Sequence, residues 1–325
     1  MDNFNFYSPT EFVFGKGREN EAGQLVKKYG GSKVLVHFGG GSVKKSGLYD
    51  RVVKSLNEAG VSFVELGGVK PNPRLSLVRE GIAICRKENI QLVLAVGGGS
   101  AIDTAKAIKK FAGQFDENYT PHLIAIPTTS GTGSEVTRFA VISNPSEGRK
   151  YPLVDEELLP DEAILDEVLV KSVPASVTAD TGMDVMTHAI EAYVSTDNNE
   201  FSGALAEKAV EISGQFLIRS YSSCDDTHAR RKMHIASCLA GLAFNSASLG
   251  LNHGMAHQLG ARFHIPHGRA NAILLPYIIE YNSGVTLAGR SQKEYPSCVR
   301  KYCNLARILG VSNMNEVTTI RALIS

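Results

Sequence analysis

The chain has 325 residues, 43% of them hydrophobic, so it is long enough for two domains that each bury a core. Its 34 basic and 33 acidic residues leave a net charge of +1, which offers no electrostatic attraction for nucleic acid or an anionic membrane. No apolar run is long enough to span a membrane, no signal-peptide pattern opens the chain, and the five cysteines form no CxxC pair. We therefore expect a cytoplasmic protein without a disulfide framework.

Strands and helices alternate through the first half of the chain. Short apolar runs predict strands at residues 33–38, 61–66, 91–96 and 122–127. Helical patterns lie at residues 19–30, 48–60, 75–89 and 101–113. Because the strands are continuously apolar rather than alternating, we expect a parallel sheet covered by helices on both faces.

After Lys171 the pattern becomes almost entirely helical. Helical periodicity runs through residues 173–195, 200–220 and 228–245. We therefore predict an α/β domain over residues 1–171, followed by an all-helical domain over residues 172–325.

Two Gly-Gly-Gly-Ser runs each follow a predicted strand and lead into a helix. Glycines let a phosphate approach the backbone, and a helix N-terminus offers N–H groups to it. In the second run, residues 97–100, Ser100 is expected to cap the helix and Asp103 to lie in its first turn. A polar run at residues 128–134 follows the fourth strand, where parallel sheets bind ligands, and Lys150 could balance phosphate charge. The alternative is a tight strand-to-helix turn and a solvated lysine.

The first of these runs, Gly39–Ser42, bears on the choice of cofactor. NAD sites place a carboxylate near the end of an early strand to bind the ribose hydroxyls. This run has no carboxylate, and Lys44 and Lys45 follow it. Backbone N–H groups, a serine hydroxyl and two ammonium groups suit a ribose 2′-phosphate, so the sequence favours NADP. The alternative is that both lysines face solvent.

A histidine-rich stretch, NHGMAHQLGARFHIPHG, lies in the helical half. His253 and His257 are four residues apart, so a helix places them on one face. His267 stands between a proline and a glycine, which predicts a turn that returns toward that face. Asp184 and His188 repeat the four-residue spacing. Two such helices could close around one divalent cation; the alternative is a set of capping and core histidines.

Four long motifs resemble the iron-containing (group III) alcohol dehydrogenase family: GGGSAIDTAKAI, PTTSGTGSEVT, TGMDVMTHAIEAY and NHGMAHQLGARFHIPHGRANAILLP. They cover much of the chain, and KVLVHFGGGSVKKSGLYD and GGVKPNP look most like the butanol dehydrogenase or aldehyde reductase branch. The resemblance implies a dinucleotide-binding α/β domain, an all-helical metal-binding domain and an active site in the cleft between them. It also implies a homodimer that interconverts primary alcohols and aldehydes by hydride transfer.

The resemblance also implies roles for single residues. The implied metal ligands are Asp184, His188, His253 and His267. The implied pyrophosphate contacts are Gly97, Gly98, Gly99, Ser100 and Asp103, and the further cofactor contacts are Thr128, Thr129, Thr132 and Lys150. Gly39, Gly40 and Ser42 fall where the family distinguishes NAD from NADP, and His257 falls beside the nicotinamide as a catalytic-site residue. His264 has no implied role and is expected to be structural.

One carboxylate and three imidazoles bind Fe²⁺ well, although Zn²⁺, Mn²⁺ and Co²⁺ compete for such a site. Two other interpretations stay open at this point. One is a zinc-dependent enzyme of the glycerol dehydrogenase type. The other is a truncated, inactive paralogue that binds metal or nucleotide, because the chain ends at Ser325 within a helical pattern where relatives continue. Such an end would remove part of the helical domain's core.

Overall fold

The computed structural model describes residues 3–114, 119–147, 149–286 and 296–325. The chain divides into two compact units. One unit is Ser8–Val173, and the other is Pro174–Ser325 together with the N-terminal segment that ends at Tyr7. That segment belongs with the helical unit because the rings of Phe4 and Phe6 pack against the ring of Phe201, at centroid distances of 5.8 and 5.6 Å.

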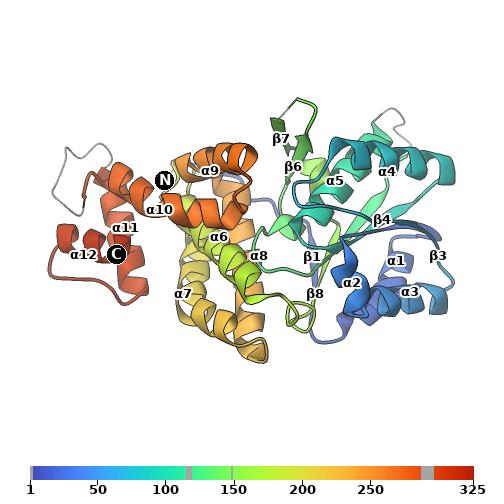
Figure 1. Cartoon of the computed structure of the whole chain (residues 1–325), viewed down its shortest axis with the longest axis horizontal. Coiled ribbons are helices and arrows are strands. Elements are labelled where there is room, and N and C mark those ends of the chain that lie inside the picture. The colour runs from blue at the N-terminus through green and yellow to red at the C-terminus, as the bar shows by residue number, and fades with distance from the viewer. Residues whose placement is uncertain (1–2, 115–118, 148, 287–295) are drawn as a thin grey trace. The chain divides into compact units, whose positions relative to one another are not determined.

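A six-stranded parallel sheet forms the centre of the first unit, in the order β1-β8-β5-β4-β2-β3 (Figure 1). Its strands are β1 (Glu11–Phe14), β2 (Lys33–Phe38), β3 (Ser62–Leu66), β4 (Leu92–Gly97), β5 (His122–Pro127) and β8 (Glu162–Leu165). A separate antiparallel hairpin pairs β6 (Phe139–Asn144) with β7 (Arg149–Val154). The four strands predicted from apolar runs are therefore confirmed, and four further strands were not predicted.

Helices cover both faces of this sheet, as the continuously apolar strands predicted. On one face, Val34 and Val36 of β2 belong to a core shared with α1 (Ala22–Lys28) and α3 (Leu48–Glu58). On the other face, Leu35 belongs to a core shared with α4 (Leu75–Glu88) and α5 (Gly99–Gly113). Successive strand residues point to opposite faces, so a strand buried on both sides is apolar throughout. The remaining helical turns are η1 (Arg18–Glu21), α2 (Gly41–Lys45), η2 (Ser134–Val136) and η3 (Glu156–Leu158).

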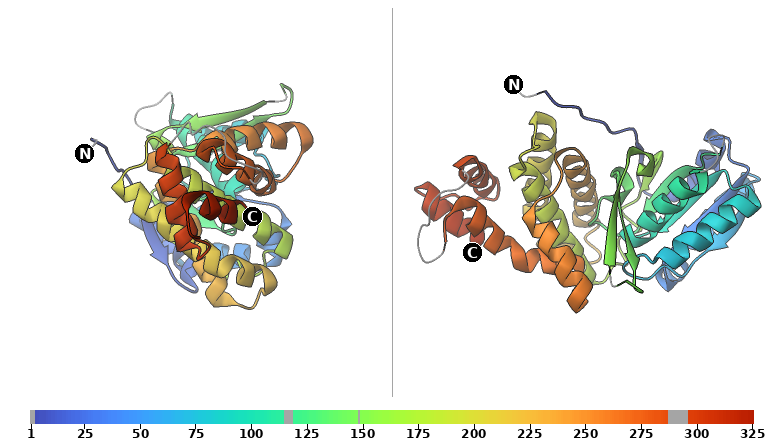
Figure 2. Two further views of the ribbon diagram at one scale, coloured as in Figure 1. Left: turned by 90° about the vertical axis from the view of Figure 1, so that its left-hand side faces the viewer. Right: turned by 90° about the horizontal axis from the view of Figure 1, so that it is seen from above.

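The second unit is helical. Its helices are α6 (Ala175–Val194), α7 (Glu200–Ser222), α8 (Thr227–Ala247), α9 (Leu251–Phe263), α10 (His267–Ser283), α11 (Pro296–Ile308) and α12 (Glu316–Ile324). The helices α6, α7 and α8 lie side by side (Figure 2), and their buried faces share one apolar core. A parallel sheet with covering helices, followed by a helical region, confirms the predicted fold class.

A helix that crosses a membrane must be both long and apolar. Over the described residues, no single helix meets both conditions. The helices α8 and α9 meet them only when taken together, and the chain bends by 109° between the two.

Candidate metal centre and nucleotide site

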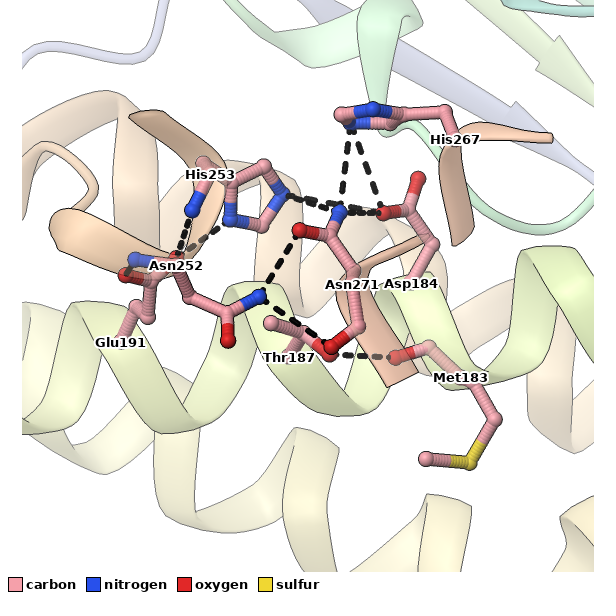
Figure 3. Close-up of polar contacts among 8 residues, drawn as sticks. All are labelled: Met183, Asp184, Thr187, Glu191, Asn252, His253, His267 and Asn271. Atoms are coloured by element: carbon pink, nitrogen blue, oxygen red, sulfur yellow. Dashed lines mark hydrogen bonds and ion pairs between the residues drawn. The ribbon is translucent and has the colours of Figure 1, made fainter. Parts of the chain in front are cut away.

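Three helices of the second unit bring four potential metal ligands together. Helix α6 carries Asp184 and His188 one turn apart, α9 carries His253, and α10 carries His267. One donor atom from each residue lies within 4.8 Å of the donor atoms of the other three. Nε2 of His253 and Nε2 of His267 lie 3.6 and 3.7 Å from Oδ1 of Asp184 (Figure 3). Donors that share a cation at about 2.0–2.2 Å are separated by similar distances.

The ring of His188 is held by its neighbours in the core. It stacks on Phe244 of α8 at 4.5 Å and on His253 at 4.4 Å, with interplanar angles of 24° and 19°. Both His188 and His253 are almost fully buried. This packing limits tilting of the ring before any ion binds.

His267 lies at the start of a helix, so its predicted position on a turn was wrong. Pro266 is the N-cap of α10, and His267 is the first helical residue. The turn precedes it, where His264 ends α9 in a left-handed conformation with φ 56°. Gly268 is buried against α6, because a Cβ there would lie 1.8 Å from the carbonyl oxygen of Asp180. The proline and glycine therefore start a helix and let it approach α6 closely.

Two residues of the centre were missed by the sequence analysis. Asn271 follows His267 by four residues, and its Nδ2 lies 2.7 Å from Oδ1 of Asp184 and 3.0 Å from Nε2 of His253 (Figure 3). Glu191 follows Asp184 by seven residues on the same face of α6, and its carboxylate accepts a hydrogen bond from Nδ1 of His253. Helical spacing was the available signal in both cases.

The carboxylates and the histidines of the centre each stabilise the charged form of the other. Burial alone would raise the pKa of Asp184, but His188, His267 and His253 outweigh it and hold that pKa far below its usual range. Burial likewise lowers the pKa of His253, but hydrogen bonds and attraction from Asp184 and Glu191 outweigh it and raise the pKa to about 9. At neutral pH the carboxylate of Asp184 is therefore charged, and His253 carries a proton that a cation must displace.

Proton displacement predicts that divalent cations bind more weakly at lower pH. The pKa of His253 in the folded chain, about 9, exceeds the ordinary histidine value of 6.5. In chelator-treated protein the proton therefore adds stability that is complete below pH 6.5 and is lost as the pH rises through 9. Because binding releases one proton, the dissociation constant of the cation should rise about tenfold for each unit by which the pH is lowered within this window. Calorimetric titration in buffers of different ionisation enthalpy measures the release. A cation affinity that does not change between pH 6.5 and 9 would contradict the prediction.

His257 lies next to the four-residue cluster but is not one of its members. It is partly buried on α9, one turn after His253. Its ring stacks on that of His267, with centroids 5.0 Å apart and an interplanar angle of 28°. The arrangement places a fourth imidazole beside the three that belong to the cluster.

In the first unit, three loops lie at one edge of the sheet. They follow the neighbouring strands β2, β4 and β5 at their carboxyl ends. The N–H of Gly39 donates to the carbonyl of Val96 at 3.2 Å, and the N–H of Thr128 donates to the carbonyl of Gly97 at 3.1 Å. The structure therefore brings together the Gly-rich and Thr-rich runs that the sequence analysis singled out.

The glycines of the second run are needed for close packing between these loops. A Cβ on Gly98 would lie 3.0 Å from Oγ1 of Thr129, and one on Gly99 would lie 2.6 Å from Oγ1 of Thr132. The backbone at the start of α5 therefore lies directly against two threonine side chains. Main-chain N–H groups and hydroxyls at a helix N-terminus form a suitable phosphate-binding surface.

Helix α5 begins earlier than predicted, which changes the positions of two residues. Gly98 is its N-cap and Gly99 its first residue, so Ser100 is not the cap and Asp103 lies beyond the first turn. The carboxylate of Asp103 accepts hydrogen bonds from Oγ of Ser134 at 2.5 Å and from the N–H of Val141 at 2.9 Å, while burial raises its pKa. In this structure Asp103 ties the following loop and β6 to α5.

The two basic candidates lie in different surroundings. Lys150 lies on β7 opposite Ser143, where burial lowers its pKa. Nζ of Lys44 lies over the ring of Tyr49 at 4.6 Å and 3.6 Å from the carboxylate of Glu65. Lys44 is therefore exposed to solvent and also contacts these two side chains. Glu65, the partner of Lys44, lies on β3, and sequence proximity could not reveal this contact.

Comparisons with known proteins agree on one family. Models described as iron-containing alcohol dehydrogenase and as the C-terminal part of that family match residues 9–167 and 178–325. The NADPH-dependent butanol dehydrogenase of Clostridium saccharobutylicum is 43% identical over an alignment of 326 positions, which covers 96% of this chain and 79% of that relative.

Solved structures match over nearly the whole chain. A 1,3-propanediol oxidoreductase has a TM-score of 0.90 and 34% identity, over 99% of this chain and 85% of its own. The NADH-dependent butanol dehydrogenase A of Thermotoga maritima has a TM-score of 0.87 and 30% identity, over 99% of this chain and 82% of its own.

Proposed function

The chain belongs to the iron-containing alcohol dehydrogenase family and is a metal-dependent, NAD(P)-linked alcohol dehydrogenase, and on that basis we propose where its metal and cofactor bind. The proposed metal ligands are Asp184, His188, His253 and His267. The observation that supports them best is the convergence of their donor atoms to within 4.8 Å of one another. One buried carboxylate and three imidazoles suit a divalent cation, which we propose to be Fe²⁺, with Zn²⁺ as an alternative.

When bound, the cation supplies a Lewis acid for the alcohol or aldehyde oxygen, and the nicotinamide supplies the hydride chemistry. The side chains of this chain provide the surroundings. Asp184 contributes one negative charge, and the packing of His188 limits motion of the site. We assign His257 the role of holding a proton for the substrate oxygen, because its ring stacks on a proposed ligand without joining the cluster.

The proposed cofactor site consists of the three loops at the carboxyl ends of β2, β4 and β5, together with the start of α5 and Lys150 on β7. Its residues are Gly39, Gly40, Ser42, Gly97, Gly98, Gly99, Ser100, Asp103, Thr128, Thr129, Thr132 and Lys150. Within it, the Gly97–Ser100 run and the threonines form the phosphate-binding surface, while Asp103 acts through its hydrogen bonds to Ser134 and Val141. In this proposal residues 1–171 bind the dinucleotide and residues 172–325 bind the metal.

Within this proposal we favour NADP over NAD. The exposed hydroxyl of Ser42 and the ammonium groups of Lys44 and Lys45 suit a 2′-phosphate. The relatives do not decide the question, because one butanol dehydrogenase is named for NADPH and the other for NADH.

Replacing Ser42 with aspartate is expected to shift preference toward NAD. The new carboxylate would repel the 2′-phosphate, and like charges brought together cost several kcal/mol, so we expect the NADPH/NADH ratio of kcat/KM to fall about tenfold or more. Ser46→Asp is the matched control, because it adds the same charge at the far end of α2. An unchanged ratio in Ser42→Asp would remove the argument for NADP.

The test of the whole proposal combines metal analysis with turnover. Purified protein is expected to contain one divalent metal per chain and to oxidise NADPH faster than NADH with short aldehydes such as butanal. Faster oxidation of glycerol than of butanol would instead favour an enzyme of the glycerol dehydrogenase type. Turnover itself excludes an inactive paralogue. The expected homodimer and cytoplasmic location belong to this proposal and are checked by sedimentation and cell fractionation.

A further inference from the structure

Glu191 is a buried carboxylate at the centre of the helical unit. It is 4% exposed on α6, two turns after Asp184 and on the same face. A buried carboxylate is costly unless hydrogen-bond donors surround it. The identity of those donors therefore indicates what the residue does.

Two of the donors are main-chain groups at the start of α9. Oε1 accepts from the N–H of Asn252 at 2.9 Å, and Oε2 accepts from the N–H of His253 at 3.2 Å. The N-cap of α9 is Gly250, which has no side chain to bind these groups. Glu191 thus caps α9 from another helix and places a negative charge at its positive end.

The third donor is the ring of His253. Nδ1 of His253 hydrogen-bonds Oε2 of Glu191 (Figure 3). A carboxylate only accepts, so Nδ1 keeps its proton, and Nε2 has a free lone pair once a cation displaces the second proton of the charged ring. Nε2 faces Oδ1 of Asp184 at 3.6 Å. One carboxylate therefore controls both the start of the helix and the tautomer of the ring.

Gly250 makes this contact sterically feasible. A Cβ at that position would lie 2.7 Å from Oε1 of Glu191. Any larger residue would push the carboxylate away from the end of α9. A variant at Gly250 can therefore disturb the contact without removing the charge.

We propose that Glu191 is a positioning residue that sets His253 as a metal donor by capping α9 and fixing the ring tautomer. This inference rests on the metal centre proposed above. A cap alone would stabilise the fold without changing metal affinity. A positioning role changes the affinity of the chelator-treated protein for a metal added by itself, which can be measured without catalysis.

The test uses Co²⁺, whose visible absorption spectrum reports its coordination. Glu191→Gln keeps the size of the side chain but replaces one acceptor with a donor, so it cannot satisfy all three N–H groups. We expect the Co²⁺ dissociation constant, measured against a competing chelator, to rise about 10- to 100-fold. Glu207→Gln is the control, because Glu207 on α7 binds the hydroxyl of Tyr193 and the side chain of Asn304 at 2.6 Å. Its Co²⁺ affinity should match that of the unaltered protein.

The outcomes separate this inference from the proposed function. An unaltered protein that binds no Co²⁺ would overturn the metal centre and this inference with it. If the unaltered protein binds Co²⁺ and Glu191→Gln binds it equally well, with only a lower melting temperature in chelator, the inference alone fails. If Glu191→Gln does not fold, Gly250→Ala decides: weaker Co²⁺ binding supports the inference, and unchanged binding overturns it.

Discussion

Replacing His267 with alanine is expected to abolish turnover and reduce bound metal, while nucleotide binding survives. The side chain lies at the start of α10, where its Nε2 is 3.7 Å from Oδ1 of Asp184. Loss of one donor weakens binding of the cation. The cation supplies several kcal/mol of transition-state stabilisation, so kcat should fall about a thousandfold or more. Elemental analysis, NADPH titration and butanal turnover measure the three effects.

His264→Asn provides the control for this substitution. His264 is exposed, lies three residues away and has a positive φ that asparagine tolerates. The His264→Asn substitution should leave metal content and turnover unchanged. Full activity of His267→Ala after loss of its metal would refute the Lewis-acid role, whereas loss of nucleotide binding would show that the variant is misfolded.

Replacing Gly268 with alanine is expected to destabilise the helical unit and weaken metal binding together. The added Cβ would lie 1.8 Å from the carbonyl oxygen of Asp180 and 3.2 Å from Cβ of Asp184. Overpacking typically lowers the free energy of unfolding by about 1–3 kcal/mol. Because the added Cβ would meet rigid backbone, we expect a loss at or above the upper end of that range. Helix α10 would have to move away from α6, carrying His267 away from Asp184. Thermal melts with and without chelator, together with Co²⁺ titration, measure both effects.

Gly254→Ala is the matched control for Gly268→Ala. Gly254 lies within α9, and a Cβ there would have no atom within 4 Å. Alanine is favoured over glycine in a helix interior by about 0.5–1 kcal/mol, so this variant should be as stable as the unaltered protein or more stable. Equal stability of the Gly268→Ala variant would contradict the close packing of α10 on α6.

The sequence was most informative where one element carries the whole signal. The strands β2, β4 and β5 were predictable because each is an apolar run buried on both faces. The short strands β1 and β8 were missed because four residues are too few to establish a pattern. The β6–β7 hairpin was missed because its second strand is largely exposed and contains a proline, Pro152.

In the candidate site, too, the features contained in one element were the ones that could be predicted. The four-residue spacing of Asp184 and His188 was visible in the sequence because both residues lie on one helix. His267 was assigned to a turn because Pro-His-Gly is typical of one, whereas the proline caps a helix and the glycine permits packing. The contact of Glu65 with Lys44 joins separate elements, and only the folded chain brings them together.

The most direct test of the metal centre is anomalous diffraction at the iron absorption edge, from crystals grown with Fe²⁺ under anaerobic conditions. The account predicts one strong peak per chain, at about 2.0–2.3 Å from single donor atoms of Asp184, His188, His253 and His267. An iron peak elsewhere, or these four side chains without a shared ion, would contradict it.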